Sequence, residues 1–245
     1  MRIALIGDVH ANLPALEAVI SHAKNQQINE IWNLGDFVGY GAYPDEVVMA
    51  LRRLEAVSIL GNYDRKVLKV EEKFDRWVGH KIPQKLLAFK WAHDNLSPVS
   101  QAYLRTLPEE RLFPVMGFSV LMTHGSPVSR NEHLTPNTPI ERLRGLTHTT
   151  NASIILCAHS HLAFKRQVDG VWFVNPGSVG RPDDGDPRAS YSILTFESGE
   201  FKAEHFRIAY DVEKAVAAIH AAHLPVEFAQ MAQLGRSLNW ILDQN

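Results

Sequence analysis

Metal-competent side chains follow five separate apolar runs of strand length. The side chains and the runs that they follow are Asp8 and His10 after residues 3–6, Asp36 after 31–34, Asn62 after 57–60, His124 after 119–123, and His159 and His161 after 153–157. Loops at the carboxyl ends of strands are where open α/β sheets place their ligands. A single Asp or Asn there is usually a turn former, but five such coincidences are not expected by chance. The pattern therefore predicts one metal site built by all seven residues.

The donor types indicate what such a site would do. Two divalent ions bring four positive charges and the carboxylates of Asp8 and Asp36 return two negative ones, which leaves a centre of about +2 that attracts an anionic phosphate. Two ions about 3.5–4 Å apart can hold both the attacking and the leaving oxygen of an in-line displacement. Oxygen and nitrogen donors without sulfur suit Mn, Fe, Co, Ni or Zn and do not choose among them. We therefore expect two divalent transition-metal ions and chemistry at phosphorus.

The elements that must position these residues follow from the hydrophobic pattern. Up to Asn62, strand-length apolar runs alternate with segments of helical period over residues 14–23 and 44–54. This alternation predicts an α/β domain with parallel strands and right-handed crossovers. Residues 65–110 carry dense charge, interleaved aromatics and no strand pattern, which predicts a helical insert. The insert is expected either to form a lid beside the site or only to cover one face of the sheet.

The second half of the chain predicts hairpins and a helical tail. Three pairs of strand patterns are separated by turn-forming glycines: 112–116 with 119–123, 163–168 with 171–174, and 191–196 with 201–207. Such antiparallel pairs favour a second sheet packed on the first. Residues 208–245 predict a helical tail, with one helix over 226–242, that docks on its own domain or on a second copy of the chain. Because no linker pattern appears, we expect residues 1–245 to form a single domain.

Composition and charge exclude several classes of protein. The formal net charge of −2 gives no strong nucleic-acid signature, since such a surface normally shows as a basic excess. The only cysteine, Cys157, excludes an intrachain disulfide and a thiolate cluster. No apolar run approaches the roughly 20 residues that a membrane-spanning helix needs, and the N-terminus lacks the pattern of a signal peptide. We therefore expect a cytoplasmic protein with a small-molecule substrate.

At these residues the sequence resembles the calcineurin-like metallophosphoesterase superfamily. Five blocks of the superfamily occur in order: Asp8-Val9-His10, Gly35-Asp36, Gly61-Asn62-Tyr63-Asp64, Thr123-His124-Gly125 and Ala158-His159-Ser160-His161. The resemblance covers roughly residues 1–207 and is closest to the small bacterial phosphodiesterase-type members. It implies an α/β fold, a two-sheet β-sandwich flanked by helices, with both metals at one end.

The resemblance also implies how the ligands are shared. Asp8, His10 and His161 would hold one metal, and Asn62, His124 and His159 would hold the other. Asp36 would bridge the two ions, and a hydroxide that bridges them would be the nucleophile. Asp36 and Asn62 would thus belong to the catalytic centre.

Tyr63 departs from the superfamily pattern. Many members carry a histidine at this position, which is credited with steadying the phosphate or protonating the leaving oxygen. A phenol with a reference pKa of about 10 is a poorer proton donor near neutrality than imidazolium. We therefore expect slow turnover that favours phosphoesters with good leaving groups, such as aryl esters. Tyr63 would act in catalysis by shaping the pocket or by hydrogen-bonding the phosphate, or it would only pack in the turn.

A second region is a candidate for substrate contact. Residues 175–182 resemble the Asn-Pro-Gly-Ser segment of the smaller bacterial members. Their backbone N–H groups could form an anion-binding concavity, or the segment could be a rigid turn that orders the metal loops. Arg181 and Arg188 are candidate substrate contacts because a guanidinium group binds phosphate as a fork. His133 is a third candidate because it lies in the loop after His124.

These residues favour a hydrolase that acts on phosphodiesters, or on phosphomonoesters. A protein Ser/Thr-type phosphatase is a weaker alternative, since those members carry the histidine that Tyr63 replaces. The other alternative is a metal-bound but non-catalytic scaffold, because the superfamily includes a coat-complex subunit with degraded ligands. Every ligand position is filled in this chain, which favours chemistry.

Overall fold

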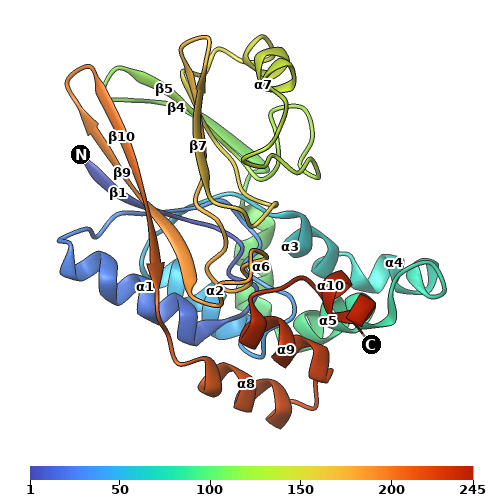
Figure 1. Ribbon diagram of the computed structural model, residues 1–245. Helices are drawn as coiled ribbons and strands as arrows, with labels where there is room; N and C mark the ends of the chain where they lie inside the picture. The colour runs from blue at the N-terminus through green and yellow to red at the C-terminus, as the bar shows by residue number, and fades with distance from the viewer. Residues whose placement is uncertain (245) are drawn as a thin grey trace.

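Two five-stranded sheets packed face to face form the centre of the structure, a computed structural model that describes residues 1–244 (Figure 1). The first sheet has the order β10-β9-β1-β2-β3 and consists of β1 (Arg2–Ile6), β2 (Ile31–Asn33), β3 (Val57–Ser58), β9 (Ala189–Glu197) and β10 (Glu200–Ile208). The second has the order β4-β5-β6-β8-β7 and consists of β4 (Glu110–Val115), β5 (Phe118–Thr123), β6 (Ile154–Leu156), β7 (Phe164–Val168) and β8 (Val171–Asn175). The predicted two-sheet α/β sandwich is therefore confirmed.

The strand β1 shows why the central strands appear in the sequence as continuous apolar runs. Successive side chains of a strand point to opposite faces of the sheet. Ile3 and Leu5 pack between the sheets, in one core with Ile154 of the second sheet. Ala4 and Ile6 pack on the other face, in the core beneath the helices. Because both faces of the strand are buried, apolar residues are favourable at every position.

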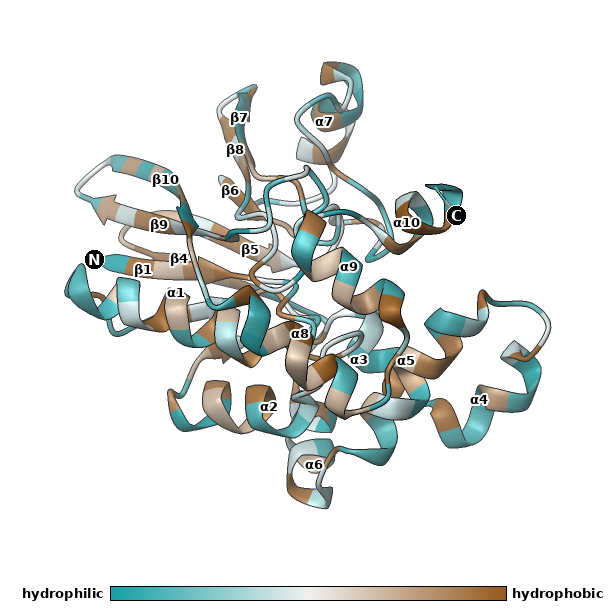
Figure 2. Ribbon diagram, turned by 60° about the horizontal axis from the view of Figure 1, so that its bottom comes forward, coloured by the Kyte–Doolittle hydropathy of each residue, from teal (hydrophilic) through white to brown (hydrophobic). Residues whose placement is uncertain are grey.

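Helices cover the outer faces of both sheets. The helices α1 (Leu13–Asn25), α2 (Pro44–Arg53) and α8 (Val212–Ala221) share a core with the first sheet, and α7 (Ile140–Thr147) shares one with the second. Figure 2 shows α1, α2 and α8 gathered on one side of the strands, with brown apolar segments along each helix. The start of α1 is fixed by Asn12, whose side chain accepts a hydrogen bond from the N–H of Ala15. This capping satisfies one of the free N–H groups at a helix start.

The predicted insert is helical. It contains α3 (Asn62–Val67), α4 (Val70–Trp77), α5 (Pro83–Asp94) and α6 (Pro98–Thr106). The first of these helices begins at Asn62, three residues before the predicted boundary at residue 65. The predicted ligand Asn62 is therefore the first residue of a helix. The helix α6 packs against α2, whereas α3 and α5 pack against each other beside the predicted site. The insert therefore both covers the domain and borders the site.

The helical tail docks on its own chain. The helices α9 (Val226–Leu234) and α10 (Leu238–Gln244) replace the single helix predicted over 226–242, and that prediction is wrong. The break is at Gly235, whose left-handed backbone (φ 58°) ends α9 and whose Cβ, if present, would lie 2.7 Å from the carbonyl carbon of Asp186. Gln84 donates to Glu227, and the rings of Phe228 and Tyr40 pack edge to face at 5.1 Å.

The predicted hairpins are present. The strand pairs β4–β5, β7–β8 and β9–β10 are antiparallel. Between β7 and β8, both Asp169 (φ 48°) and Gly170 (φ 84°) are left-handed, as a tight two-residue hairpin turn requires. Parallel pairing of β6 with β5 and β8 joins the first two hairpins into the second sheet. The third hairpin, β9–β10, instead pairs with β1 in the first sheet, so the expectation that all three pairs build the second sheet is wrong for this one. Within residues 1–244, no helix has the length and apolar character needed to cross a membrane.

Candidate metal centre

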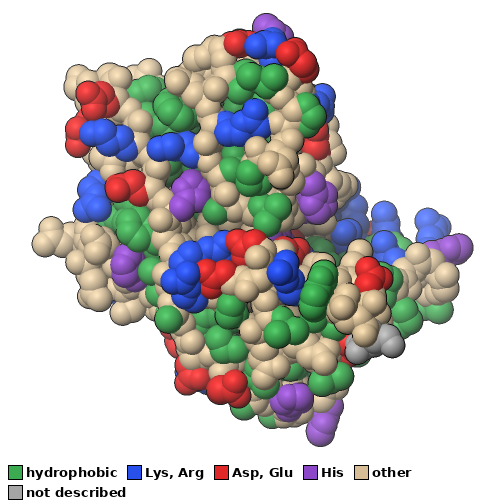
Figure 3. Space-filling view, viewed as in Figure 1, with side chains coloured by type: hydrophobic (Ala, Val, Ile, Leu, Met, Phe, Trp, Pro, Cys, Tyr) green, Lys and Arg blue, Asp and Glu red, His purple; other side chains and the backbone are tan. Residues whose placement is uncertain are grey.

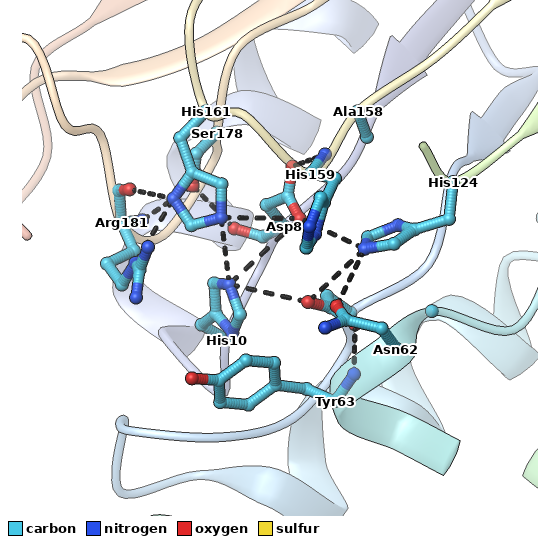
Figure 4. Close-up of polar contacts among 12 residues, drawn as sticks. Asp8, His10, Asn62, Tyr63, His124, Ala158, His159, His161, Ser178 and Arg181 are labelled. Carbon is cyan, nitrogen blue, oxygen red and sulfur yellow. Dashed lines mark hydrogen bonds and ion pairs between the residues drawn. The ribbon is translucent and has the colours of Figure 1, made fainter. Parts of the chain in front are cut away.

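Five of the seven predicted ligands have a left-handed backbone directly after their strands. They are Asp8 (φ 52°), His10 (φ 48°), Asp36 (φ 53°), His159 (φ 67°) and His161 (φ 60°). This region costs an L-residue roughly 1–2 kcal/mol and persists where the surroundings enforce it. Figure 4 shows the side chains of Asp8, His10 and His161, which come from separate loops, directed toward one another. The sharp turns are what direct side chains at strand ends toward one site.

Two glycines let the loops after β2 and β3 touch through their backbones. A Cβ on Gly35 (φ 91°) would lie 2.4 Å from the backbone nitrogen of Gly61. A Cβ on Gly61 would lie 2.1 Å from the backbone nitrogen of Asp36. Both distances are shorter than non-bonded atoms tolerate, so only glycine permits this approach. The contact holds Asp36 and Asn62 beside each other.

Each of the two aspartates has one carboxylate oxygen held by the backbone and one directed at histidines. Asp8 Oδ2 accepts from the N–H of His159 at 3.0 Å, and Asp36 Oδ1 accepts from the N–H of Tyr63 at 2.7 Å. Asp8 Oδ1 lies 3.5 Å from Nε2 of His161. Asp36 Oδ2 lies 3.5 Å from Nε2 of His124. The backbone bonds thus fix each carboxylate and leave its second oxygen for another partner.

The protein holds Nδ1 of three histidines and sets the tautomer of two of them. In His161, Nδ1 lies 2.6 Å from the Arg181 carbonyl oxygen and 3.1 Å from Nε of the same arginine, which donates to it. Nδ1 lies 3.2 Å from the Val38 oxygen in His10 and 2.8 Å from the Leu34 oxygen in His124. A carbonyl oxygen only accepts hydrogen bonds, so Nδ1 carries the proton in these two rings. Nε2 of a neutral ring is then free to bind a metal.

The donor atoms form two overlapping groups. One contains Asp8, His10 and His161, and the other contains Asp8, Asp36 and His124, with the donor atoms of each group within 4.8 Å of one another. Nε2 of His10 lies 3.2 Å from Nε2 of His161. At this distance the two nitrogens form a hydrogen bond when one of them carries a proton, and they repel each other when neither does unless a cation lies between them.

An unpaired oxygen strengthens the fit to metal ions. Asp8, which both groups share, is fully buried, and its Oδ1 has no hydrogen-bond partner among the described residues. Such an oxygen is costly to bury unless a cation binds it. Asn62 Oδ1 adds a further donor, 3.0 Å from Nε2 of His124. The described residues therefore fit divalent metal ions.

His159 lies at the side of this cluster. It belongs to neither group, and its ring packs against those of His124 and His133, with centroids 5.1 and 4.2 Å away. Its contact with Asp8 is through the backbone N–H. The structure thus brings six of the seven predicted ligands together and leaves the His159 ring beside them.

Burial and charge pairing set the ionisation of the metal-free site. Burial by itself raises the pKa values of the Asp8 and Asp36 carboxyls, but the neighbouring histidines lower both to about 2. Burial lowers the pKa of His10 well below its usual range and that of His159 to about 3. Burial acts in the same direction on His124, but the charge of Asp36 outweighs it and raises that pKa to about 9. A metal that binds His124 would therefore displace a proton from its ring. The side chains of Asp8, Asp36, His10 and His159 are already in the protonation state that binds a metal.

Asp64 holds together the loops after β2 and β3, which carry the predicted ligands Asp36 and Asn62. The sequence pattern did not reveal this role. Its fully buried carboxylate accepts from the N–H groups of Asp36 at 2.9 Å, Gly61 at 2.9 Å and Val38 at 3.2 Å. Three hydrogen bonds from two different loops make this side chain a brace between them. The signal available in the sequence was its place beside Asn62 in a superfamily block, which does not separate a ligand from a brace.

The segment 175–182 is a second brace. Ser178 Oγ donates to the Asp8 carbonyl at 2.7 Å, and Asn175 Nδ2 donates to the Ala158 carbonyl at 2.9 Å. The N–H groups of residues 179–181 donate to Gly7, Asp8 and Ser178. Because protein acceptors use these groups, they form no anion-binding concavity. Of the two predicted roles, the structure favours the rigid turn that orders the metal loops.

Tyr63 packs under the cluster. Its ring meets that of His10 edge to face at 5.1 Å, and its hydroxyl is hydrogen-bonded to the hydroxyl of Tyr40. Burial raises the pKa of Tyr63 well above its usual value. The sequence did not single out Tyr40. Its own backbone is left-handed (φ 64°), in the loop that brings its ring beside Tyr63.

A cavity of about 680 Å³ opens over the cluster. Of the predicted substrate contacts, Arg181 and His133 line it, and the Arg181 side chain is only 14% exposed. Arg188 does not line it; its side chain is 53% exposed and donates to Asp186 on the surface. The wall also contains three lysines and a histidine that the sequence did not single out, Lys66, Lys81, Lys85 and His80.

Comparisons with known proteins agree with this geometry. A family model described as the calcineurin-like phosphoesterase superfamily domain matches residues 1–199, a span that contains all seven predicted ligands. The uncharacterized protein MJ0912 of Methanocaldococcus jannaschii is 32% identical over 253 residues, which cover 96% of this chain and 98% of that protein. Phosphodiesterase YfcE of Escherichia coli is 27% identical over 198 residues, which cover 79% of this chain and 87% of that protein.

Solved structures share the arrangement of strands and helices. A metallophosphoesterase from Sphaerobacter thermophilus is 29% identical, with a TM-score of 0.79 and coverage of 96% of this chain and 99% of that one. Protein PH1004 of Pyrococcus horikoshii, 21% identical with a TM-score of 0.86 and the same coverage, shows the fold alone. This chain therefore belongs to the calcineurin-like phosphoesterase superfamily and is a metal-dependent hydrolase of phosphoester bonds.

Proposed function

We propose that this protein is a phosphodiesterase that uses two divalent transition-metal ions, with phosphomonoesters as a secondary substrate class. Asp8, His10 and His161 would hold one ion. Asn62, His124 and His159 would hold the other, and Asp36 would bridge the two. The phosphodiesterase named among the relatives supports diesters as the substrate class.

One observation carries the proposal. The unpaired Asp8 Oδ1 and the second oxygen of Asp36 face histidine Nε2 atoms in a buried cluster at the base of a cavity. When bound there, two ions supply a strong positive potential for a phosphoryl oxygen and lower the pKa of water. The protein fixes the donors in advance, because each aspartate is held by a backbone N–H and three histidines by backbone carbonyls. Such preorganisation avoids reordering the site during the reaction.

Residues of the wall would bind and orient the phosphate. Arg181 is held by its Nη2 bond to Asp183 at 3.1 Å and by the Tyr40 ring, whose centroid lies 4.9 Å from the guanidinium carbon. A guanidinium fixed in this way presents its remaining N–H groups to an anion at a small entropic cost. Tyr63 supports the floor of the cavity, but its raised pKa makes its hydroxyl a weak acid for protonating a leaving oxygen.

A metal and leaving-group panel tests this proposal. Chelated protein is reloaded separately with Mn²⁺, Fe²⁺, Ni²⁺ and Zn²⁺, bound metal is counted per chain, and rates are measured on aryl phosphomonoesters and phosphodiesters. We expect two ions per chain, no hydrolysis without metal, and higher kcat/KM on diesters. A fully loaded protein that cleaves none of these esters would instead indicate a binding scaffold.

The Tyr63→His variant is expected to hydrolyse esters of poor leaving groups faster. An imidazolium beside the site can protonate the leaving oxygen, and general acid catalysis typically contributes about 10²-fold or more. The gain should be largest for alkyl esters and small for p-nitrophenyl esters, whose leaving group needs no proton. The measurement is the slope of log kcat/KM against leaving-group pKa. Tyr63→Phe is the control and should keep the wild-type slope; an unchanged slope in Tyr63→His would remove the proton-donor argument.

A further inference from the structure

A second hollow of about 250 Å³ adjoins the catalytic cavity and is lined by cations. Its residues are Asn62, Arg65, Lys66, Lys69, Lys73, Trp77, Arg130 and Asn131. Asn62, Lys66 and Asn131 also line the catalytic cavity, so the two spaces meet beside the metal cluster. Five of the eight lining residues are cationic and none is acidic. We call this hollow the basic groove.

The charge of the basic groove is only partly neutralised. Glu109 forms ion pairs with Arg65 and Arg130. Among residues 1–244, Lys66, Lys69 and Lys73 have no carboxylate oxygen within 4.0 Å of their ammonium groups. Figure 3 shows Lys and Arg side chains gathered on the right of the molecule, over α3 and α4. The chain as a whole has a net charge of −2, so this concentration is local and not a property of the composition.

Helical spacing explains how the groove acquires one sign of charge. In α4, Lys73 and Trp77 are four residues apart and therefore share one face, which lines the groove. Glu71 and Glu72 of the same helix are exposed and lie outside the lining. These two glutamates thus point to solvent, while Lys66, Lys69 and Lys73 border the hollow.

Lys66 links the groove to the catalytic cavity. Its ammonium lies over the rings of Tyr63 and Phe89, 5.0 and 5.5 Å from their centroids, and the side chain is half-buried. Burial lowers the pKa of this ammonium, because the charged form is less well solvated there than in water. A half-buried cation with aromatic rings but no carboxylate beside it is suited to an anion delivered by a ligand.

We propose that the substrate carries a second phosphate group, which the basic groove binds while the metal cluster holds the phosphoester to be cleaved. The inference rests on the proposed function and narrows its substrate class to bisphosphorylated small molecules. The volume of the catalytic cavity, about 680 Å³, falls within the range of small-ligand sites, and the adjoining groove of about 250 Å³ is smaller still, which favours a small molecule over a nucleic-acid strand.

A matched pair of probes tests the inference. The first is the p-nitrophenyl ester of thymidine 5′-phosphate, and the second is the same ester with an added phosphate on the 3′ oxygen. With Mn²⁺-loaded protein, we expect the 3′-phosphate to raise kcat/KM about tenfold, mainly by lowering KM. This factor corresponds to about 1.4 kcal/mol of added binding free energy. Added NaCl should shrink the advantage, because salt screens exposed charges.

Variants in α4 and at Lys69, the residue directly before it, locate the effect. The double variant Lys69→Gln/Lys73→Gln should remove most of the advantage that the 3′-phosphate confers. Arg76→Gln is the matched control: it removes a positive charge from the same helix, but Arg76 is exposed and lies outside the groove lining. Equal kcat/KM for the two probes, or the same loss in both variants, would overturn the inference and leave the proposed function intact.

A binding measurement distinguishes a failure of the proposed function from a failure of the inference about the basic groove. If neither probe is hydrolysed, the proposed function is contradicted, and calorimetry then compares thymidine 3′,5′-bisphosphate with thymidine 5′-monophosphate. Tighter binding of the bisphosphate by wild type and Arg76→Gln, but not by the double variant, would support the groove. Equal affinities for the two nucleotides would overturn it.

Discussion

Asp36→Asn is expected to lower kcat/KM for aryl phosphodiesters by about 10³-fold or more, because it removes a charge from the centre of the metal cluster. Asp36 Oδ2 lies 3.7 Å from Nε2 of His10 and 3.5 Å from Nε2 of His124, between the two donor groups. An amide has the same shape but is a weaker and neutral ligand. Bound metal per chain should therefore fall along with the rate, and elemental analysis and steady-state kinetics measure the two effects.

The matched control for this variant is Asp186→Asn. It makes the same chemical change at a carboxylate that pairs with Arg188 on the surface, outside the cavity. We expect it to retain wild-type metal content and kcat/KM. An Asp36→Asn protein that still bound two ions and kept its rate would contradict the bridging role assigned to Asp36.

Asp64→Ala is expected to lower the free energy of unfolding by about 3–5 kcal/mol. The substitution leaves three buried N–H groups, those of Asp36, Val38 and Gly61, without their acceptor. The loops after β2 and β3 would lose their brace, so metal affinity should fall about 10- to 100-fold as well. Urea unfolding of the metal-free protein measures the first effect, and metal titration measures the second.

Asp45→Ala provides the comparison. The Asp45 carboxylate also accepts a backbone hydrogen bond, but only from Ser97, and it lies near the surface at the start of α2. Its loss should cost about 1 kcal/mol and leave metal affinity unchanged. Equal destabilisation by both variants, or wild-type metal affinity in Asp64→Ala, would show that Asp64 does not brace the metal loops.

Local patterns were enough to predict most of the fold. The strands predicted at residues 3–6 and 171–174 are present as β1 and β8, and the turn at Asp169-Gly170 joins its hairpin as expected. Burial of both strand faces produces apolar runs, and a two-residue turn requires left-handed residues, so each signal is contained within a few neighbouring positions. The helix predicted over 226–242 failed because its break at Gly235 depends on a contact with Asp186, a residue distant in sequence.

The sequence by itself determined which residues end the strands beside the site, and the family match supports their chemistry. The tertiary structure decided how they are arranged, because the contacts join segments far apart in the chain. His10 meets His161 across 151 positions, and Asp64 holds the backbone of Asp36 across 28. The cations of the insert and the residues of the tail reach the cavity in the same way. Spacing along the chain encodes the direction of a side chain within its own element, whereas the neighbours it meets depend on how the sheets and helices pack.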